Sequence, residues 1–288
     1  ALMITSHQNR VARRKARFED FRSDAREIEL QLHAVAEKTR KDVRFMSNLP
    51  PIQAIIHAKA GEEGAESLEV WRDRLETIYE GLLRANPEYL GVTYLTVDEG
   101  NPREIVRVER NATEQGFISR VPDSRLTTLE PGAIMEEVKK MQPGDARLVL
   151  GQRIANEDAI VSRRSLIGVV PVFDDASGDL YGLVAIESNV TVQIERILDG
   201  FGMLLGSIYV TDMQGRVWVE ATPDYGVEIE SDDVNVTTLL PETKEFYVEG
   251  STMRHLSDDE EFVAMRVFLD PTDSSCILGL AMQLSDEP

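Results

Sequence analysis

The first part of the chain carries apolar positions at the spacing of a helix. Apolar or small residues recur at alternating steps of three and four, and neither Gly nor Pro occurs before Pro50. The positions are Phe18, Phe21, Ala25, Ile28, Leu32, Val35 and Thr39. This pattern predicts one long helix with a heptad seam, ended by the prolines at 50 and 51 because a residue before proline avoids the helical region. The seam can pair with a second chain or pack on the protein's own body, and the sequence alone does not choose.

Two shorter helices are predicted after these prolines. The stretch Ile52 to Ala60 is helical in pattern and ends at the loop Gly61 to Gly64. An amphipathic helix follows and ends at Asn86-Pro87, because proline cannot continue a helix. Its apolar face consists of Leu68, Trp71, Leu75, Ile78 and Leu82.

From residue 90 the apolar period changes from that of a helix to that of a strand. Polar turns separate the strand-like segments, which predicts an antiparallel sheet with a helical cover. The predicted strands are 90–97, 104–110, 117–121, 146–153, 165–173 and 180–188, with a modest helix at 133–141.

A second series of strands begins near Phe201 and matches the first at both ends. Each series starts with a strand, a polar turn and a second strand, at 91–108 and at 206–219, and closes with a longer hairpin, at 172–185 and at 267–282. Two diverged copies of one module explain this match. We therefore predict an α+β fold with a long N-terminal helix and helical cover over 1–86, one module at 87–190, a connecting helix at 191–200 and a second module at 201–288.

Composition and charge narrow the classes of function. The net charge of −20 excludes a nucleic-acid binder, whose affinity comes from neutralising phosphates. The apolar runs are too short to span a bilayer. The first 45 residues nevertheless carry eleven basic and seven acidic side chains. Their basic cluster, Arg10, Arg13, Arg14, Lys15 and Arg17, either faces anionic headgroups or forms a solvated helix face.

Catalytic and metal-binding signatures are absent from the sequence. Cys276 is the single cysteine and sits in an apolar run, which predicts a buried thiol acting as a small hydrophobe. The four histidines are scattered, and no nucleophile, zinc, phosphate-loop or dinucleotide motif is present. We therefore expect no enzyme activity in this fragment, no metal and no cofactor.

Several stretches resemble one family of bacterial sensor regions. They are Leu49 to Ile55, Trp71 to Leu75, Ile78-Tyr79, Asn86 to Leu90 and Arg103 to Arg110. Together with the long helix and the duplicated module, they are similar to the double PAS-like sensor regions, also called double Cache or PDC, of histidine kinases and diguanylate cyclases. The resemblance implies two tandem PAS-like modules, the first distal to the membrane and the second proximal.

The resemblance also implies a place and a task. The fragment would lie in the periplasm, between two transmembrane helices that it lacks, and would sense a small molecule in the distal module. It would be a non-catalytic part of a sensor histidine kinase in a two-component system, dimerising through the N-terminal helix. The alternatives are the ectodomain of a diguanylate cyclase or chemoreceptor, or a helical-stalk scaffold that binds a protein partner and no small molecule.

Candidate ligand residues come from the strands of the first module. Strand alternation places Arg163, Ser165 and Ile167 on one face and their neighbours on the other. We predict a site for an anionic ligand, because a guanidinium fork suits a carboxylate or phosphate. Its residues would be Tyr94, Arg107, Arg147, Arg163, Arg164, Ser165 and Asp174. The alternative is that these arginines pair with the many surface carboxylates.

One stretch departs from the pattern of the relatives. Many of them carry aromatic residues there that hold the carboxylate or amino group of a metabolite. Here the corresponding stretch, Glu130 to Val138, contains neither an aromatic residue nor a cation. An amino acid or dicarboxylate bound in the usual manner is therefore not expected, and the pocket is either empty or takes another kind of molecule.

Overall fold

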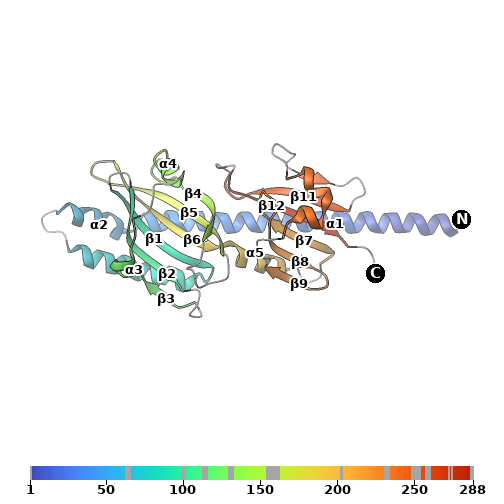
Figure 1. Cartoon of the computed structure of the whole chain (residues 1–288), viewed down its shortest axis with the longest axis horizontal. Helices are drawn as coiled ribbons and strands as arrows, with labels where there is room; N and C mark the ends of the chain where they lie inside the picture. Colours follow the sequence, from blue (N-terminus) through green and yellow to red (C-terminus); the bar gives the residue numbers. More distant parts are fainter. Residues whose placement is uncertain are drawn as a thin grey trace. The chain divides into compact units, whose positions relative to one another are not determined.

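The computed structural model contains two antiparallel sheets and a long N-terminal helix (Figure 1). The residues that it describes are 2–61, 66–98, 101–111, 116–128, 133–153, 163–201, 204–229, 234–247, 254–256, 261–271, 273 and 275–285. The chain forms two compact units. One unit combines Ala1–Val35 with Thr191–Pro288, and the other is Ala36–Val190, so the long helix contributes to both.

Helices precede the first sheet, as the sequence predicts. The long helix α1 spans Leu2–Ser47, and α2, Pro50–Ala60, starts directly at the proline pair. The third helix, α3, spans Leu68–Ala85 and ends at Asn86, whose backbone N–H donates to the carbonyl of Leu82. A proline at the first turn of a helix costs little because that N–H has no partner inside the helix.

The first sheet has six strands in the order β3-β2-β1-β6-β5-β4, all antiparallel. Its strands are β1 (Tyr89–Asp98), β2 (Asn101–Arg110), β3 (Ile118–Arg120), β4 (Arg147–Arg153), β5 (Arg163–Phe173) and β6 (Leu180–Asn189). Between β3 and β4 lie the short helices η1, Asp123–Arg125, and α4, Ala133–Val138. The helix α5, Val190–Asp199, directly follows β6.

The second sheet repeats the topology of the first. Its order, β10-β11-β12-β7-β8-β9, becomes that of the first sheet when β7, β8 and β9 are matched to β1, β2 and β3. The strands are β7 (Gly206–Thr211), β8 (Val217–Thr222), β9 (Gly226–Ile229), β10 (Arg254–Leu256), β11 (Phe262–Phe268) and β12 (Ile277–Leu284). The helices α6, Val236–Leu239, and η2, Pro241–Glu245, lie between β9 and β10. The predicted α+β fold with a duplicated module is confirmed.

The heptad seam of α1 is buried within the chain. Phe21, Ile28 and Leu32 are each no more than 1% exposed, and Thr39 is equally buried in the other unit. The seam therefore packs on the protein's own body, which decides between the two alternatives that the sequence left open. Outward-facing positions of the same helix include the exposed side chains of Leu30 and Phe45.

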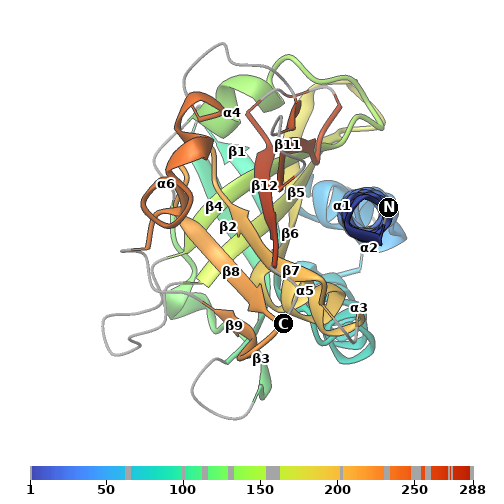
Figure 2. The same cartoon turned by 90° about the vertical axis from the view of Figure 1, so that its right-hand side faces the viewer.

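Two arginines of the basic cluster on α1 contact residues near the second sheet within their own unit. Arg14 forms an ion pair with Glu261, and Arg17 donates from Nη2 to the backbone carbonyl of Ser285 at 3.3 Å. In the view of Figure 2, α1 is seen end-on, and α1 and α6 lie on opposite sides of β7 and β8.

Cys276 is buried as expected. Within the described residues, none of the helices combines the length and apolar character needed to cross a bilayer.

Candidate functional site

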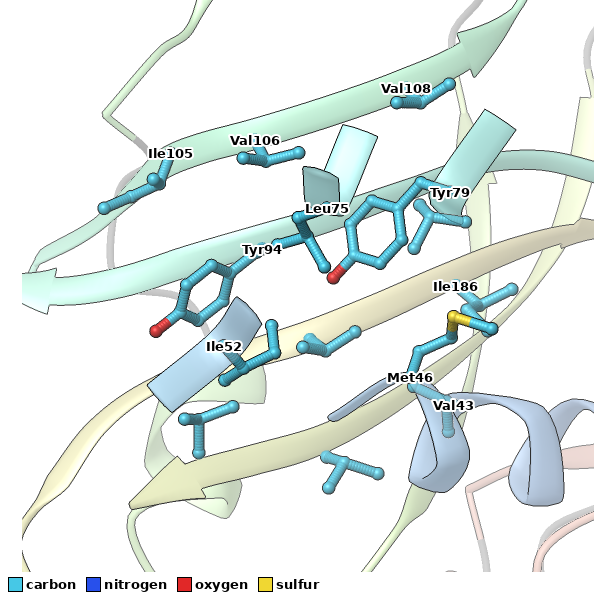
Figure 3. Close-up of a cluster of buried hydrophobic side chains, with 14 of the residues drawn as sticks. Val43, Met46, Ile52, Leu75, Tyr79, Tyr94, Ile105, Val106, Val108 and Ile186 are labelled. Atoms are coloured by element: carbon cyan, nitrogen blue, oxygen red, sulfur yellow. The ribbon is translucent and has the colours of Figure 1, made fainter. Parts of the chain in front are cut away.

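The two faces of the first sheet differ in how completely they are filled. One face is packed by the end of α1 and by α2 and α3, in a core that contains Met46, Ile52, Leu75, Tyr79 and Tyr94 (Figure 3). The hydroxyls of Tyr79 and Tyr94 are buried there without a hydrogen-bond partner. Burial raises the pKa of both hydroxyls well above the usual value. At the edge of this face, Lys59, Leu68, Arg72, Ile105 and Asp123 help to line a separate pocket of about 210 Å³.

The opposite face carries a hollow in two adjoining halves. Their volumes are about 320 Å³ and about 250 Å³, and Gly91, Thr93, Glu104, Ile167 and Glu187 line both. Small-molecule sites are typically about 300–1,000 Å³ and mix an apolar lining with a few polar groups. We call this hollow the β1–β6 cavity, after the central strands of its floor.

Among the described residues, three carboxylates and one guanidinium line the polar half of the β1–β6 cavity. Arg107 donates to Glu104 Oε1 at 3.3 Å and to Glu109 Oε2 at 2.5 Å. Glu187 faces the cavity from β6 and accepts from the hydroxyl of Ser165 at 2.7 Å. Burial opposes the charge of Arg107, but Glu109 and Glu104 outweigh this effect, so the pKa of the guanidinium is raised.

The apolar half lies beneath α4. Met135 of that helix packs with Leu95, Val169 and Leu183 from the sheet, and Ile167 adds to this cluster. These side chains alternate along their strands with residues that face α1 to α3, since Thr93 and Leu95 line the cavity whereas Tyr94 lies in the opposite core.

A β-bulge sets which residues of β2 face the cavity. Tyr94 pairs with Val106, but the next residue, Leu95, pairs with Glu104, so Ile105 is the extra residue. Glu104, Arg107 and Glu109 therefore share one face, although 104 and 107 would lie on opposite faces of a regular strand.

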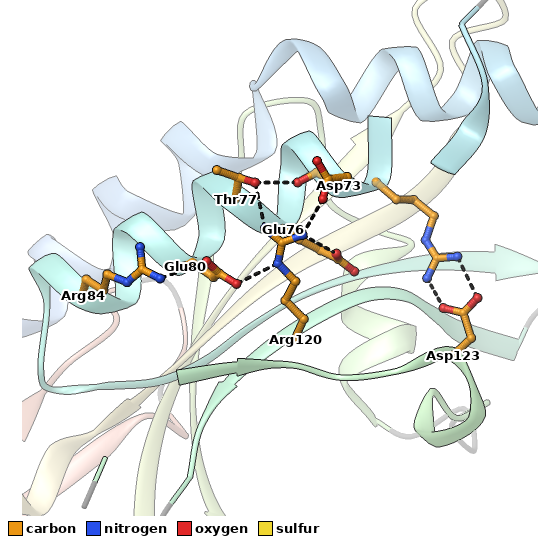
Figure 4. A network of polar contacts seen from close by, with 8 residues as sticks. Asp73, Glu76, Thr77, Glu80, Arg84, Arg120 and Asp123 are labelled. Carbon is orange, nitrogen blue, oxygen red and sulfur yellow. Dashed lines mark hydrogen bonds and ion pairs between the residues drawn. The ribbon is translucent and has the colours of Figure 1, made fainter. Parts of the chain in front are cut away.

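An ionic network ties the wall of the cavity to α3. Glu104 accepts from the backbone N–H of Thr127 at 3.0 Å, and Glu109 accepts from Arg125 at 3.0 Å. From the same segment, Asp123 forms a two-pronged pair with Arg72 of α3 (Figure 4). The hydrogen bond from Arg72 lowers the pKa of Asp123 below its usual value.

Arg120 of β3 makes a second link to α3. Its guanidinium bonds to Glu80 at 2.7 Å, Asp73 at 2.5 Å, Glu76 at 3.3 Å and the hydroxyl of Thr77 at 2.8 Å (Figure 4). The hydrogen bonds that Arg120 donates to Glu80 and Asp73 raise the pKa of this guanidinium above its usual value. The outer wall of the cavity is thus held to the helical cover by several charged contacts.

The structure separates the residues expected to form an anion site. Arg107 lines the cavity, and Ser165 reaches it through its bond to Glu187. Tyr94 does not converge with them, because it points into the core under the helices. Arg164 follows the same alternation as Leu166 and is buried on that helix-covered side of β5.

The remaining three predicted residues lie toward the ends of strands. Arg147 begins β4 opposite Val169, and so shares the cavity face of the sheet. Arg163 is the first residue of β5 and pairs with Arg153, and its side chain lies outside the described residues. Asp174 caps the turn after β5 and accepts from the backbone N–H of Ala176 at 2.9 Å, so it acts in the turn. That bond lowers the pKa of Asp174.

Sequence reasoning missed the glutamates of the cavity. Glu104, Glu109 and Glu187 sit among 51 acidic residues, so their type carries no signal. The alternation of β6 does contain a signal, because Glu187 is a charged residue flanked by the buried Ile186 and Ser188. The bulge at Ile105 hides the equivalent signal in β2.

The corresponding face of the second sheet is filled. A bulge follows Val210 in β7 as one follows Tyr94 in β1, which places Tyr209 and Val217 at the positions of Thr93 and Glu104. Tyr209 and Val217 pack with Val236 and Leu240 at α6. Among the described residues, packed apolar side chains of the second sheet therefore stand where the first sheet has its cavity.

Tyr247 completes this closed core. Its hydroxyl lies 2.9 Å from Thr211 Oγ1, and the side chain packs on the cluster around Tyr209. Burial raises the pKa of Tyr247 to about 12. A Cβ at Gly279 would press on both Thr211 and Tyr247, so the glycine allows this close contact.

Solved structures share this architecture over nearly the whole chain. A domain of a protein ascribed to the sensory box/GGDEF family of Vibrio parahaemolyticus matches with a TM-score of 0.65 at 10% identity, covering 95% of this chain and 97% of that one. The periplasmic sensory domain of the Campylobacter jejuni chemoreceptor Tlp1 matches with a TM-score of 0.53 at 11% identity, over 90% and 91%. The sensor domain of the V. cholerae histidine kinase DctB matches with a TM-score of 0.52 at 10% identity, over 95% and 99%.

The chain has the fold of these sensor domains. The resemblance to double PAS-like sensor regions is thereby confirmed for the fold. The parent proteins of this fold include a histidine kinase and a chemoreceptor, so it is not restricted to one kind of output. No family model and no curated protein matches the sequence.

Proposed function

We propose that this chain is the extracytoplasmic sensory domain of a membrane receptor and binds a small molecule in the β1–β6 cavity. The observation that carries the proposal is the contrast between the two copies of the module. The first copy keeps a cavity over its sheet, whereas the second fills the corresponding face with Tyr209, Val217 and Tyr247. The domain itself is non-catalytic and acts in the periplasm.

Ligand binding would change the contacts of the helical cover through the ionic network on the outer wall of the cavity. Glu104 and Glu109 belong both to the cavity and to the contacts that hold the segment 123–127. That segment contacts α3 through Asp123 and Arg72. A ligand that changes the partners of these glutamates would therefore alter how the wall holds the helical cover.

The experiment is a thermal-shift screen of the purified domain against a panel of small metabolites. A ligand at 100 times its Kd stabilises a protein by about 2.7 kcal/mol, which is readily detected. The matched variant is Thr93→Tyr, which places at the cavity the residue type that fills the second sheet. Ser67→Tyr, at an exposed position at the start of α3, is the control.

We expect Thr93→Tyr to abolish the ligand-induced shift and Ser67→Tyr to retain it, with both variants folded by circular dichroism. A ligand that stabilises the Thr93→Tyr variant as strongly as the parent would place binding elsewhere and contradict the proposed site. A complete absence of hits would favour the helical-stalk scaffold that binds a protein partner.

The output and assembly of the parent receptor are finer proposals. We infer a sensor histidine kinase in a two-component system, and the coding sequence downstream of Pro288 distinguishes it from a chemoreceptor or a diguanylate cyclase. We also propose a homodimer through the N-terminal helix. Because the seam is buried, the contact would use outward positions such as Leu30 and Phe45. Sedimentation of the Leu30→Asp variant tests this, since an unchanged dimer mass would contradict it.

A further inference from the structure

We infer that the β1–β6 cavity takes a ligand with an aromatic ring, which packs beside Ala185 as the ring of Tyr209 packs beside Ala281. This inference rests on the proposed function and names the class of molecule that is sensed. The second module is the template, because it has the same strand order and fills the corresponding space with its own side chains. The ring that the first module lacks in this space would come from its ligand.

The register of the strands places the two alanines at one position of the module. Thr93 pairs with Ala185 in the first sheet. In the second sheet, Tyr209 pairs with Ala281, and the two share one apolar cluster. Cross-strand partners on one face of a sheet lie within contact distance of each other. Because Thr93 and Ala185 both line the apolar half of the cavity, the space beside Ala185 is the one that a ring fills in the other copy.

Aromatic side chains gather on this face of the second sheet. Tyr247 joins two clusters there, one with Tyr209 and one with Phe246 and Phe262. The rings of Phe246 and Tyr247 meet edge to face, with centroids 4.9 Å apart. In the first sheet, Ile167 holds the strand position of Phe262. Among the described residues that line the β1–β6 cavity, none is aromatic.

The apolar half of the cavity has the size and the lining for one ring. Its volume is about 250 Å³, and an apolar cavity of about 150 Å³ suffices to bind benzene. Leu95, Val169 and Leu183 line it from the sheet, and Met135 lines it from α4. A thioether sulfur makes favourable contacts with aromatic rings. The adjoining polar half would take the polar substituent of the ring.

The test compares compounds that share a head and differ only in the apolar group. Each of three heads, an ammonium, a carboxylate and a hydroxyl, is offered with a phenyl, a cyclohexyl and an isopropyl group on the same ethylene spacer. Calorimetry on the purified domain measures each affinity. With the preferred head, we expect the phenyl compound to bind more tightly than the cyclohexyl compound, although a cyclohexyl group has at least as much apolar surface to bury. It should bind about tenfold or more tightly than the isopropyl compound, since more apolar area is buried.

Enlarging Ala185 should remove the space for the ring. Ala185 is half-buried and lines the cavity, so the added carbons of Ala185→Leu would enter it. We expect phenyl binding to weaken by about tenfold or more in Ala185→Leu and to be retained in Ala185→Ser, which keeps a small side chain. Ala85→Leu, at the exposed end of α3, is the matched control and should leave the affinity unchanged. Circular dichroism checks that the variants are folded.

The outcomes separate this inference from the proposed function. Equal or tighter binding of a cyclohexyl or isopropyl compound, or unchanged binding of a ring-bearing ligand in Ala185→Leu, overturns the inference and leaves a small-molecule sensor. If no phenyl compound binds, the first hit of the metabolite panel decides. A hit without an aromatic ring overturns the inference, whereas a ring-bearing hit that is lost in Ala185→Leu supports it. If neither these compounds nor the panel binds, both the inference and the proposed function fail.

Discussion

Thr93 of β1 and Tyr209 of β7 occupy the same register position in the two sheets, one residue before the last pair ahead of a β-bulge. Thr93 lines a cavity, and Tyr209 fills the corresponding space. The exchange of Thr93 for Tyr209 is thus one of the differences between the two copies, beside that of Glu104 for Val217 and the added ring of Tyr247. The difference is one of side-chain volume, since the strand order is the same.

Shortening Tyr209 should open the closed core at a cost in stability. The variant Tyr209→Thr removes a buried ring, and loss of a large core side chain costs about 3–5 kcal/mol. Denaturant unfolding measures this loss. Tyr225→Thr is the control, because Tyr225 is 80% exposed and its loss should change the free energy of unfolding by less than about 0.5 kcal/mol. Equal effects of the two variants would contradict the closed core.

Charge in the seam of α1 should unfold the protein. Ile28 and Leu32 are buried within the chain, so Ile28→Asp with Leu32→Asp places two carboxylates in the core, at a cost of more than about 4 kcal/mol. Leu30→Asp lies on the same helix at a position that is 67% exposed and should retain the fold. Circular dichroism compares them. A folded double variant with a reduced mass in sedimentation would instead place the seam between chains.

Tyr94 should tolerate the loss of its hydroxyl. The group is buried without a hydrogen-bond partner, and an unsatisfied buried polar group costs about 1–3 kcal/mol. We therefore expect Tyr94→Phe to be neutral or stabilising in denaturant unfolding and to leave ligand affinity unchanged, because the side chain faces away from the cavity. A destabilisation above about 1 kcal/mol would reveal a partner for the hydroxyl.

Acid should weaken the link between Asp123 and Arg72. The pKa of Asp123 is lowered in the folded state, so its contribution is fully present above the unfolded value of 3.8 and is lost as the pH falls through the lower folded value. The Asp123→Asn variant should therefore show a shallower loss of stability below this pH than the parent. Asp175→Asn, in an exposed turn, is the control. Parallel acid profiles of the parent and Asp123→Asn would contradict the pair.

The arrangement of elements was largely predictable because each rests on local periodicity. The prolines at 50 and 51 end α1, and the polar turns fix the hairpins of both modules. The surface against which the seam packs was not predictable, since a heptad pattern can pack on a second chain or on the protein's own sheets equally well. Its burial at Ile28 depends on the rest of the fold.

The cavity was less predictable because one residue reverses the faces of a strand. The bulge at Ile105 brings Glu104 and Arg107 to the same side, and no turn or glycine in β2 marks it. Matching the two copies by sequence aligns Tyr94 with Tyr209, whereas the bulges align Thr93 with Tyr209. Tyr94 itself lies in the core because it alternates along β1 with Thr93 and Leu95, which line the cavity.

Amide hydrogen exchange with and without the first stabilising metabolite tests the central claim most directly. The account predicts slower exchange in β1, β2 and β6 around Thr93, Arg107 and Glu187, and no change in β7 and β8. Protection confined to the second sheet, or the same protection in the Thr93→Tyr variant, would contradict the assignment of the β1–β6 cavity as the sensory site.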